Sequence, residues 1–365
     1  MLDLSRREIL ILLGAGLVGC GVDLDLAPDA TFDEVLDALH ATAPLFDNGL
    51  ANHGPMAAET LVELGLSDRV AAYIEDYASR LEWRGNDDLV TAADRPASLG
   101  DTSRAEGWIA GYEAEVDGGV SALDLLRRDW AMLAPGLVGA GWHGLLRVAH
   151  AVRSLEREDT PSRHRELAHG LGLLGAAARP LPGTPESTPQ LPPLAALAAV
   201  PVVSPASRVT SGYIVDRLAP VDDLEGFADA VNALDLEGVE ATAAVSELCA
   251  AAARMYLDVG GRSIHLLHGV TGTSALRLLF GVLDEEARRL GLGYGFAALA
   301  ALRAAHGADP TGESPPAGTT ETELRDAAAE ASDEHAIKLI EAALREYAAA
   351  PNPELLAAAH DFALT

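Results

Sequence analysis

The stretch that decides the fold is Leu137–Leu155, with the sequence LVGAGWHGLLRVAHAVRSL. Apolar residues recur in it at helical spacing, which is typical of an amphipathic α-helix. The same spacing recurs at Phe32, Val35, Leu36 and Leu39 and continues along nearly the whole chain. Strand-like alternation is hard to find, and aromatic residues make up only 5% of the sequence. The sequence therefore predicts an all-α fold in which many helices pack around one another.

Two segments interrupt the helical pattern. The first holds eight prolines between Pro180 and Pro205, a density that excludes a helix there and predicts a long connection over residues 179–206. The second, His306–Thr320, holds Pro310, Pro315, Pro316 and three glycines. Because histidines in unusual sequence contexts lie on both sides of the first connection, we expect one domain, residues 31–365, with a long Pro-rich insertion.

Composition and charge exclude some classes of protein. The chain has 365 residues, of which 49% are hydrophobic and 22% charged, as in soluble globular proteins. Its 55 acidic and 26 basic residues give a net charge of −29. Nucleic acid binding depends on the neutralisation of phosphates by Lys and Arg, so nucleic acid is not expected as a partner. Lys338 is the only lysine in the chain.

The first twenty residues resemble an export signal. Arg6 and Arg7 precede a short apolar run, Ile9–Cys20, which is shorter than the roughly 18 residues of a membrane-spanning helix. This layout is typical of a twin-arginine signal, and Leu17–Cys20 resembles a lipoprotein box with Cys20 as the lipidated residue. We therefore expect residues 1–20 to direct export to the cell envelope, with membrane contact only through Cys20. The alternative is an ordinary N-terminal extension of a cytoplasmic protein.

The same segment contains a weak dinucleotide-binding pattern. Gly14, Gly16 and Gly19 form G-x-G-x-x-G after a strand-like run. Such a motif must open a helix that is followed by a second strand. Here Pro28 stops any helix, and Thr31–His40 has a helical pattern. A nucleotide-binding domain is therefore not expected.

Other common catalytic motifs are missing from the sequence. It contains neither a G-x-S-x-G elbow nor a phosphate-binding loop. Cys249 lies in an apolar helical stretch, where a buried inert thiol is expected. Four histidines on polar or Ala-rich flanks, His40, His164, His306 and His360, are predicted to be ordinary surface residues.

Several other histidines lie in unusual contexts. His53 precedes Pro55, which is suited to the first turn of a helix. His143 and His150 are seven residues apart and share an otherwise apolar helix face. His268 has a similar apolar context, whereas His265, one turn earlier, is predicted to be a bystander. A buried histidine needs a hydrogen-bond partner or a metal, so a helix cap, a bonded core histidine and a metal ligand all remain open.

His335 and Lys338 form the sharpest pair. They lie three residues apart, so on a helix they are neighbours. Ion pairs at the end of a helix would explain His335 and Lys338. Histidines from several helices can also build a metal site in a helical core. A buried neutral lysine can react with carbon dioxide to form a carbamate, which is an anionic oxygen ligand, because burial lowers the pKa of lysine.

Taken in order, these motifs resemble the questin oxidase-like family, whose members oxidatively open anthraquinone-type rings in aromatic polyketide pathways. The resemblance extends from about Thr31 to Asp361 and rests on the segments Asn52–Met56 (NHGPM), His143–Arg147 (HGLLR), His268–Gly272 (HGVTG) with Ala275–Arg277 (ALR), and Asp333–Lys338 (DEHAIK).

The resemblance implies a site as well as an activity. It implies a non-haem iron oxygenase in which Lys338 is carboxylated and the imidazole ligands are His53, His143, His268 and His335. His150 would act in catalysis by supporting a metal ligand or by contacting the substrate, although it and His143 could exchange roles. Dioxygen and a small aromatic compound are the expected partners. The apolar residues expected to line a dry substrate pocket are Met56, Trp142, Leu146 and Leu267.

Three alternatives stay open. Members of the same family are also described as NADPH-dependent Baeyer–Villiger-type monooxygenases, but no NADPH-binding motif is found here. Zinc with the carboxylated lysine could instead activate water in a hydrolase, although such sites usually lie at barrel strand ends and strands are scarce here. The chain could also be a catalytically silent helical scaffold whose histidines only bond within the core.

Overall fold

A computed structural model of the protein describes residues 21–47, 49–261, 263–311 and 318–364. The described residues form one helical domain with only two very short strands, which confirms the all-α prediction. The predicted signal segment, with Cys20 and the three glycines of the nucleotide-binding pattern, lies outside the described residues. No helix in the described ranges is long and apolar enough to cross a membrane.

The described α-helices are α2 Phe32–Leu39, α3 Gly54–Glu63, α4 Val70–Ala78, α5 Arg95–Ser98, α6 Ala105–Asp117, α7 Ala122–Leu133, α8 His143–Arg157, α9 Pro161–Ala176, α10 Pro193–Ala199, α11 Ile214–Leu218, α12 Phe227–Asn232, α13 Ala241–Asp258, α14 Ile264–Leu279, α15 Glu285–His306, α16 Glu321–Glu330, α17 Glu334–Ala349 and α18 Pro353–Leu364. The short 3₁₀ helices are η1 Ser67–Arg69, η2 Thr102–Arg104, η3 Ala134–Gly136, η4 Gly139–Trp142, η5 Pro205–Ser207 and η6 Ala219–Val221. The strands β1 Leu45–Phe46 and β2 Leu50–Ala51 pair antiparallel, with Leu45 opposite Ala51.

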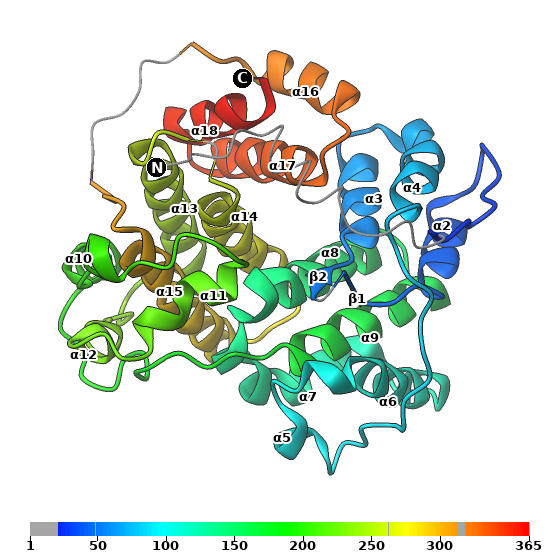
Figure 1. Cartoon of the computed structure of the whole chain (residues 1–365), viewed down its shortest axis with the longest axis horizontal. Helices are drawn as coiled ribbons and strands as arrows, with labels where there is room; N and C mark the ends of the chain where they lie inside the picture. The colour runs from blue at the N-terminus through cyan, green and yellow to red at the C-terminus, as the bar shows by residue number, and fades with distance from the viewer. Residues whose placement is uncertain (1–20, 48, 262, 312–317, 365) are drawn as a thin grey trace.

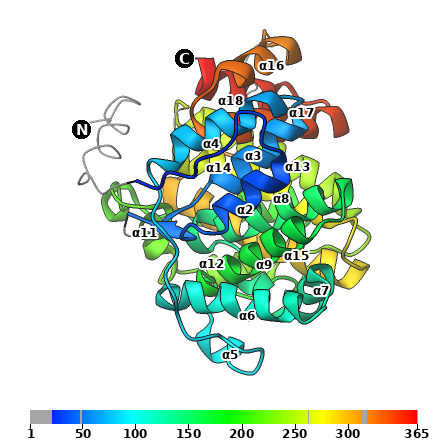
Figure 2. The same cartoon turned by 90° about the vertical axis from the view of Figure 1, so that its right-hand side faces the viewer.

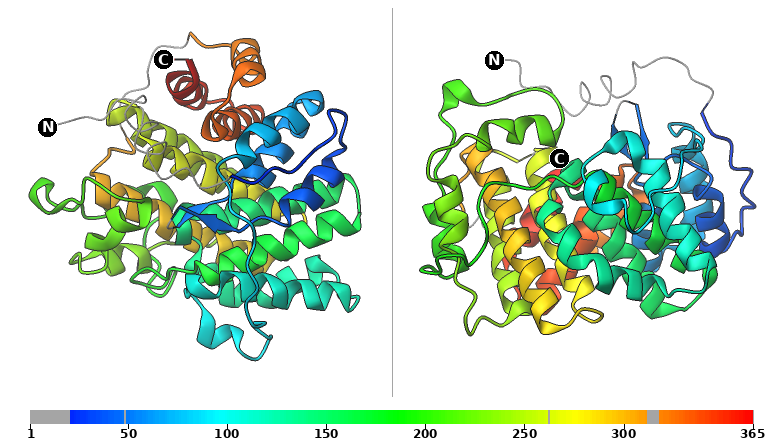
Figure 3. Two further views of the ribbon diagram at one scale, coloured as in Figure 1. Left: turned by 45° about the vertical axis from the view of Figure 1, so that its right-hand side comes forward. Right: turned by 90° about the horizontal axis from the view of Figure 1, so that it is seen from below.

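Four helices far apart in the sequence close a ring of contacts. α3 packs on α8, α8 on α14, α14 on α17, and α17 again on α3 (Figure 1). α6 and α7 lie on the side of α8 and α9 away from α17, and α5 lies below α6 (Figure 2). The orange-to-red segment α16–α18 lies at the top of the left view of Figure 3, where α17 packs on α3 and on α14. The ring therefore brings one end of each of its four helices toward a common centre.

Side-chain caps fix where the helices of this ring begin. Asp333 accepts a hydrogen bond from the backbone of His335 and starts α17, so that His335 lies in its first turn. Ser263 caps α14 by accepting from Leu266. Pro55 lies in the first turn of α3, where its missing N–H costs nothing. The start of α3 is one residue earlier than Pro55, at Gly54.

A glycine allows α8 and α9 to approach closely. A Cβ added to Gly144 would lie 2.6 Å from the Cα of Leu174, a separation that no side chain tolerates. The two helices therefore pack backbone to backbone, which fixes the first turn of α8 and the position of His143.

The Pro-rich connection is more ordered than predicted. It contains the helix α10 and the 3₁₀ helix η5, so the expectation that proline density excludes a helix there was wrong. Pro193 occupies the first turn of α10, and the six residues that follow contain no proline. The prolines therefore start and end the helix instead of preventing it.

Candidate metal centre

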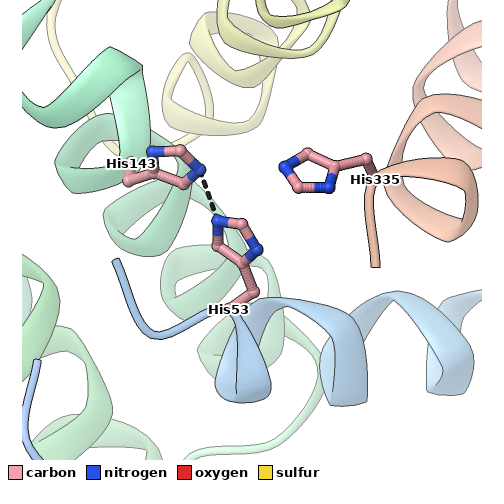
Figure 4. A group of neighbouring side chains, drawn as sticks. All are labelled: His53, His143 and His335. Carbon is pink, nitrogen blue, oxygen red and sulfur yellow. Dashed lines mark hydrogen bonds between the residues drawn. The ribbon is translucent and has the colours of Figure 1, made fainter. Parts of the chain in front are cut away.

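The four predicted ligand histidines meet at the centre of the ring of helices formed by α3, α8, α14 and α17. His53 directly precedes α3, His143 is the first residue of α8, and His335 lies in the first turn of α17. One ligand atom of each lies within 4.8 Å of the others. Figure 4 shows these three rings turned toward one another from three separate helices. The rings of His268, from α14, and His335 lie 5.3 Å apart.

The Nε2 atom of His143 is the focus of the cluster. It lies 2.5 Å from Nε2 of His53, the contact drawn as a dashed line in Figure 4, and 3.2 Å from Nε2 of His268. All four histidines are buried, with exposed fractions between 1% for His268 and 9% for His335. Water therefore has little access to the nitrogens that face one another.

The opposite ring nitrogens assign the tautomers. Nδ1 of His143 faces the backbone carbonyl of Ala140, and Nδ1 of His268 lies 2.5 Å from that of Ile264. Nδ1 of His53 lies 3.0 Å from a carboxylate oxygen of Glu334. Carbonyl and carboxylate oxygens only accept hydrogen bonds, so each Nδ1 must carry a hydrogen. In a neutral imidazole the Nε2 atom then holds a lone pair.

Three histidines of the cluster, His53, His143 and His268, favour this neutral form. Burial, together with nearby positive charge that includes Lys338, lowers the pKa of His53, His143 and His268 well below 6.5. Three nitrogen lone pairs therefore converge without a proton between them. Such an arrangement is repulsive alone and is stabilised by a cation among the nitrogens, which is how neutral imidazole binds metals.

Carboxylates surround the cluster and orient its rings. Glu334 bonds His53 and is itself held by Arg80, whose two terminal nitrogens lie 3.1 and 3.2 Å from its oxygens. Nδ1 of His335 lies 3.2 Å from Asp333, which directs the Nε2 side of that ring away from the cap. A carboxylate or carbonyl on the far nitrogen is the usual support of a metal-binding histidine.

Lys338 is buried beside the cluster without a partner. It is 2% exposed, and its Nζ makes no hydrogen bond within the described part of the chain. Burial lowers the pKa of this amine to about 8, although the nearby Glu334 and Asp333 oppose the shift. An amine with this pKa is neutral in about a tenth of molecules at pH 7, far more than an ordinary lysine, and carbamate formation requires this neutral form.

The backbone immediately before His143 is strained. Ala140, Gly141 and Trp142 have φ values of 46°, 64° and 67°, so all three adopt the left-handed conformation. For a residue with a side chain this conformation costs about 1 kcal/mol or more. The turn places the Ala140 carbonyl against Nδ1 of His143, which is the contact that fixes its tautomer.

His150 does not join the other histidines. Its Nδ1 lies 2.7 Å from a carboxylate oxygen of Glu59, which also binds Arg153. Arg153 in turn bonds Glu341 at 2.5 Å. The structure thus places His150 in a neighbouring ion-pair network, and its expected role in catalysis stays a prediction.

The predicted pocket residues lie in the main hydrophobic core. Met56, Trp142, Leu146 and Leu267 are at most 1% exposed. Trp142 packs so closely on α14 that a Cβ at Gly272 would lie 2.4 Å from its ring. An aromatic substrate could contact these side chains only if they moved, so the pocket stays a prediction.

A second group of histidines was missed by the sequence analysis. His40 is 7% exposed, so the expectation that it is a surface residue was wrong. Its Nε2 lies 3.1 Å from Glu166, and its ring lies 4.5 Å from that of His169. Arg147, from one of the motifs quoted above, occupies both oxygens of Glu166 at 2.6 and 2.8 Å. Arg147 therefore neutralises Glu166 as Arg80 neutralises Glu334, and the cluster at His143 differs by its converging imidazole Nε2 atoms.

Glu166→Gln is expected to destabilise the protein by about 3–5 kcal/mol, because it leaves Arg147 buried without its counter-charge. Iron content should stay unchanged. Urea unfolding and metal analysis of the same preparations check both points. Loss of metal at unchanged stability would contradict this assignment and make the His40 cluster the metal site.

Two further expectations can be compared with the structure. Cys249 is buried and free, as predicted. His306 was expected at the surface but is partly buried against His265, with ring centroids 5.8 Å apart. Its flanking sequence is rich in alanine, and the packing of α14 on α15 brings the two rings together.

Searches against protein-family models and against curated proteins find no match to this chain.

Proposed function

We propose that the protein is a non-haem iron oxygenase that opens a ring of an anthraquinone-like aromatic polyketide with dioxygen as oxidant. The proposed ligands are His53, His143, His268 and His335 together with carboxylated Lys338. The observation that carries this proposal is the convergence of imidazole Nε2 lone pairs on His143. The substrate class comes from the family resemblance of the motifs.

The number and type of donors favour iron. Imidazole nitrogen suits zinc, copper, nickel and iron alike, so the histidines alone do not choose a metal. Protein-bound zinc usually has four tetrahedral ligands. Four imidazoles and one carbamate oxygen would exceed that number and leave one position of an octahedron open. When bound, a ferrous ion would supply the one-electron chemistry that lets dioxygen react with an electron-rich ring.

The chain's own residues have separate tasks in this proposal. Glu334 and Asp333 hold the Nδ1 hydrogens of His53 and His335, so that both rings present Nε2 to the centre. The unprotonated Lys338 amine forms a bond to the carbon of carbon dioxide and releases a proton, giving a carbamate. The buried apolar side chains around the cluster keep water away.

Lys338→Met tests the carbamate. The variant should bind iron less well, yet its metal-free form should be about 3 kcal/mol more stable than the metal-free wild type at pH 7, because a buried ammonium is removed. The native pKa of Lys338 is about 8, below its ordinary 10.5. The free energy of unfolding of the metal-free wild type should therefore rise between pH 8 and pH 10.5. The difference in stability between Lys338→Met and the wild type should then be smaller at pH 10.5 than at pH 7. Metal analysis and urea unfolding at both pH values provide the measurement.

The prediction would be contradicted if Lys338→Met kept the iron content of the wild type, or if its metal-free form were less stable than the metal-free wild type. Arg325→Met serves as a control, because it removes a positive charge from an exposed position.

Oxygen uptake tests the activity. The iron-loaded protein should consume dioxygen when a reduced anthraquinone is added, without NADPH. A strict need for NADPH would favour the monooxygenase alternative, and stoichiometric zinc without oxygen uptake would favour the hydrolase. If the protein bound no metal and the histidine variants lost only stability, the result would favour the alternative of a catalytically silent helical scaffold.

A further inference from the structure

Four basic side chains form a partly buried group beside the metal centre. Arg217 lies on α11, His265 on α14 and His306 at the end of α15, and Arg208 lies in the connection before α11. All four are partly exposed, so solvent reaches each of them. We refer to them as the basic cluster.

Helix geometry places the basic cluster next to the proposed ligands. His265 precedes His268 by three residues on α14, so the two side chains are neighbours on one helix face. The ring of His265 stacks on that of His306, with centroids 5.8 Å apart and an angle of 26°. α11 packs both on α15 and on the η4 turn that precedes His143. The cluster and the metal centre therefore adjoin through α14 and η4.

The basic cluster has no carboxylate partner among the described residues, although the chain has 55 acidic residues. Nε of Arg217 and Nε2 of His306 are buried and make no hydrogen bond there. Nε of Arg208 donates to the carbonyl of Val203. His265 bonds the backbone of Gly212. Arg80, Arg147 and Arg153, which also lie near the centre, are each paired with glutamate.

The charges of the cluster are therefore available to a ligand. Burial and the charge of Arg217 lower the pKa of His265 to about 3 and that of His306 to about 4. The two imidazoles are thus neutral at physiological pH and can donate hydrogen bonds, while the two guanidinium groups carry the positive charge. A guanidinium beside an N–H donor suits a carboxylate or a phenolate.

Because the chain as a whole is strongly acidic, an anion can bind favourably only at a local group of positive charges. A net charge of −29 repels negatively charged molecules over most of the surface. An anionic compound would gain attraction only where positive charge is unpaired.

We propose that the basic cluster, with Arg217 at its centre, binds an anionic oxygen of the aromatic substrate, a carboxylate or an ionised phenol, beside the metal centre. This inference rests on the proposed function for the identity of the ligand as substrate. The binding itself does not require metal.

The test is equilibrium binding to the metal-free full-length protein. The probes are an anthraquinone carboxylate, a hydroxyanthraquinone ionised at the pH of the experiment, and the neutral anthraquinone carboxamide. The variants are Arg217→Gln, His306→Gln and, as a matched control, Arg104→Gln. Arg104 is also partly exposed, and within the described ranges it donates to one backbone carbonyl, that of Asp88, away from the cluster.

We expect an anionic probe to bind the wild type more tightly than the carboxamide. Arg217→Gln should raise the dissociation constant of that anionic probe about tenfold, and His306→Gln less, since a charged hydrogen bond contributes more than a neutral one. Carboxamide binding, the iron content of both variants and all properties of Arg104→Gln should stay unchanged. Which of the two anions loses affinity identifies the group that is recognised.

Equal affinity for charged and neutral probes, or no effect of Arg217→Gln beyond that of Arg104→Gln, would overturn the inference. The proposed function fails on different grounds, namely absence of metal or of oxygen uptake. An Arg217-dependent preference for anions in a protein that binds no iron would leave the anion site standing and remove the oxygenase.

Discussion

His143→Ala should lower iron affinity at least about 100-fold and abolish oxygen uptake. His143 is the residue whose Nε2 faces both His53 and His268, so its removal opens the centre of the donor set. The fold should persist, because removal of the His143 ring also removes the repulsion between its Nε2 lone pair and those of His53 and His268. Iron titration followed by metal analysis gives the affinity, and far-UV circular dichroism checks the fold.

His164→Ala is the matched control for this experiment. His164 is bonded to Asp159 near the surface, and its side chain is 20% exposed. Its removal should leave iron affinity and oxygen uptake unchanged. If His143→Ala kept full iron affinity, or if both variants lost it equally, the assignment of the centre would be wrong.

The metal-free protein should lose stability steeply as the pH falls below 6.5. The native pKa values of His53, His143 and His268 lie well below 6.5, so between those values and 6.5 only the unfolded chain takes up protons at these positions. Protons then favour unfolding by about 1.4 kcal/mol per pH unit for each histidine, or roughly 4 kcal/mol per unit for the three. Stability is complete above pH 6.5. The pKa of Glu334 is lowered from its ordinary 4.5, so the stability that Glu334 contributes is lost only as the pH falls below 4.5.

Urea unfolding of the metal-free protein between pH 7 and pH 5 measures this slope. His268→Leu should reduce it by about a third, because one of the three groups is removed. Stability that stays level over this range would show that the histidines are protonated in the native state. The lone-pair argument for a metal would then fail.

Much of the fold could be predicted from the sequence because helical spacing is a local property. The spacing of Phe32, Val35, Leu36 and Leu39 predicts the buried face of α2, on which Val35, Leu36 and Leu39 are fully buried. Proline was harder to interpret. Its effect depends on its place within a helix, and Pro193 begins α10 where a count of prolines argued against one.

The candidate site was predicted in part for a different reason. Histidines in apolar helical segments must find partners, and the structure brings together four of the five that were singled out, whereas His150 bonds Glu59 instead. Their supporting residues could not be predicted. Glu334 is adjacent to His335 in sequence but also bonds His53, which is 281 residues away. Only the packing of α17 on α3 creates that contact.

The most direct test of the account is metal analysis of the wild-type protein, produced with added iron and purified without oxygen. The account predicts close to one iron per chain, lost in parallel from His335→Ala and Lys338→Ala. A folded wild-type protein that binds no metal under these conditions would contradict it, because three converging imidazole lone pairs would then need another explanation.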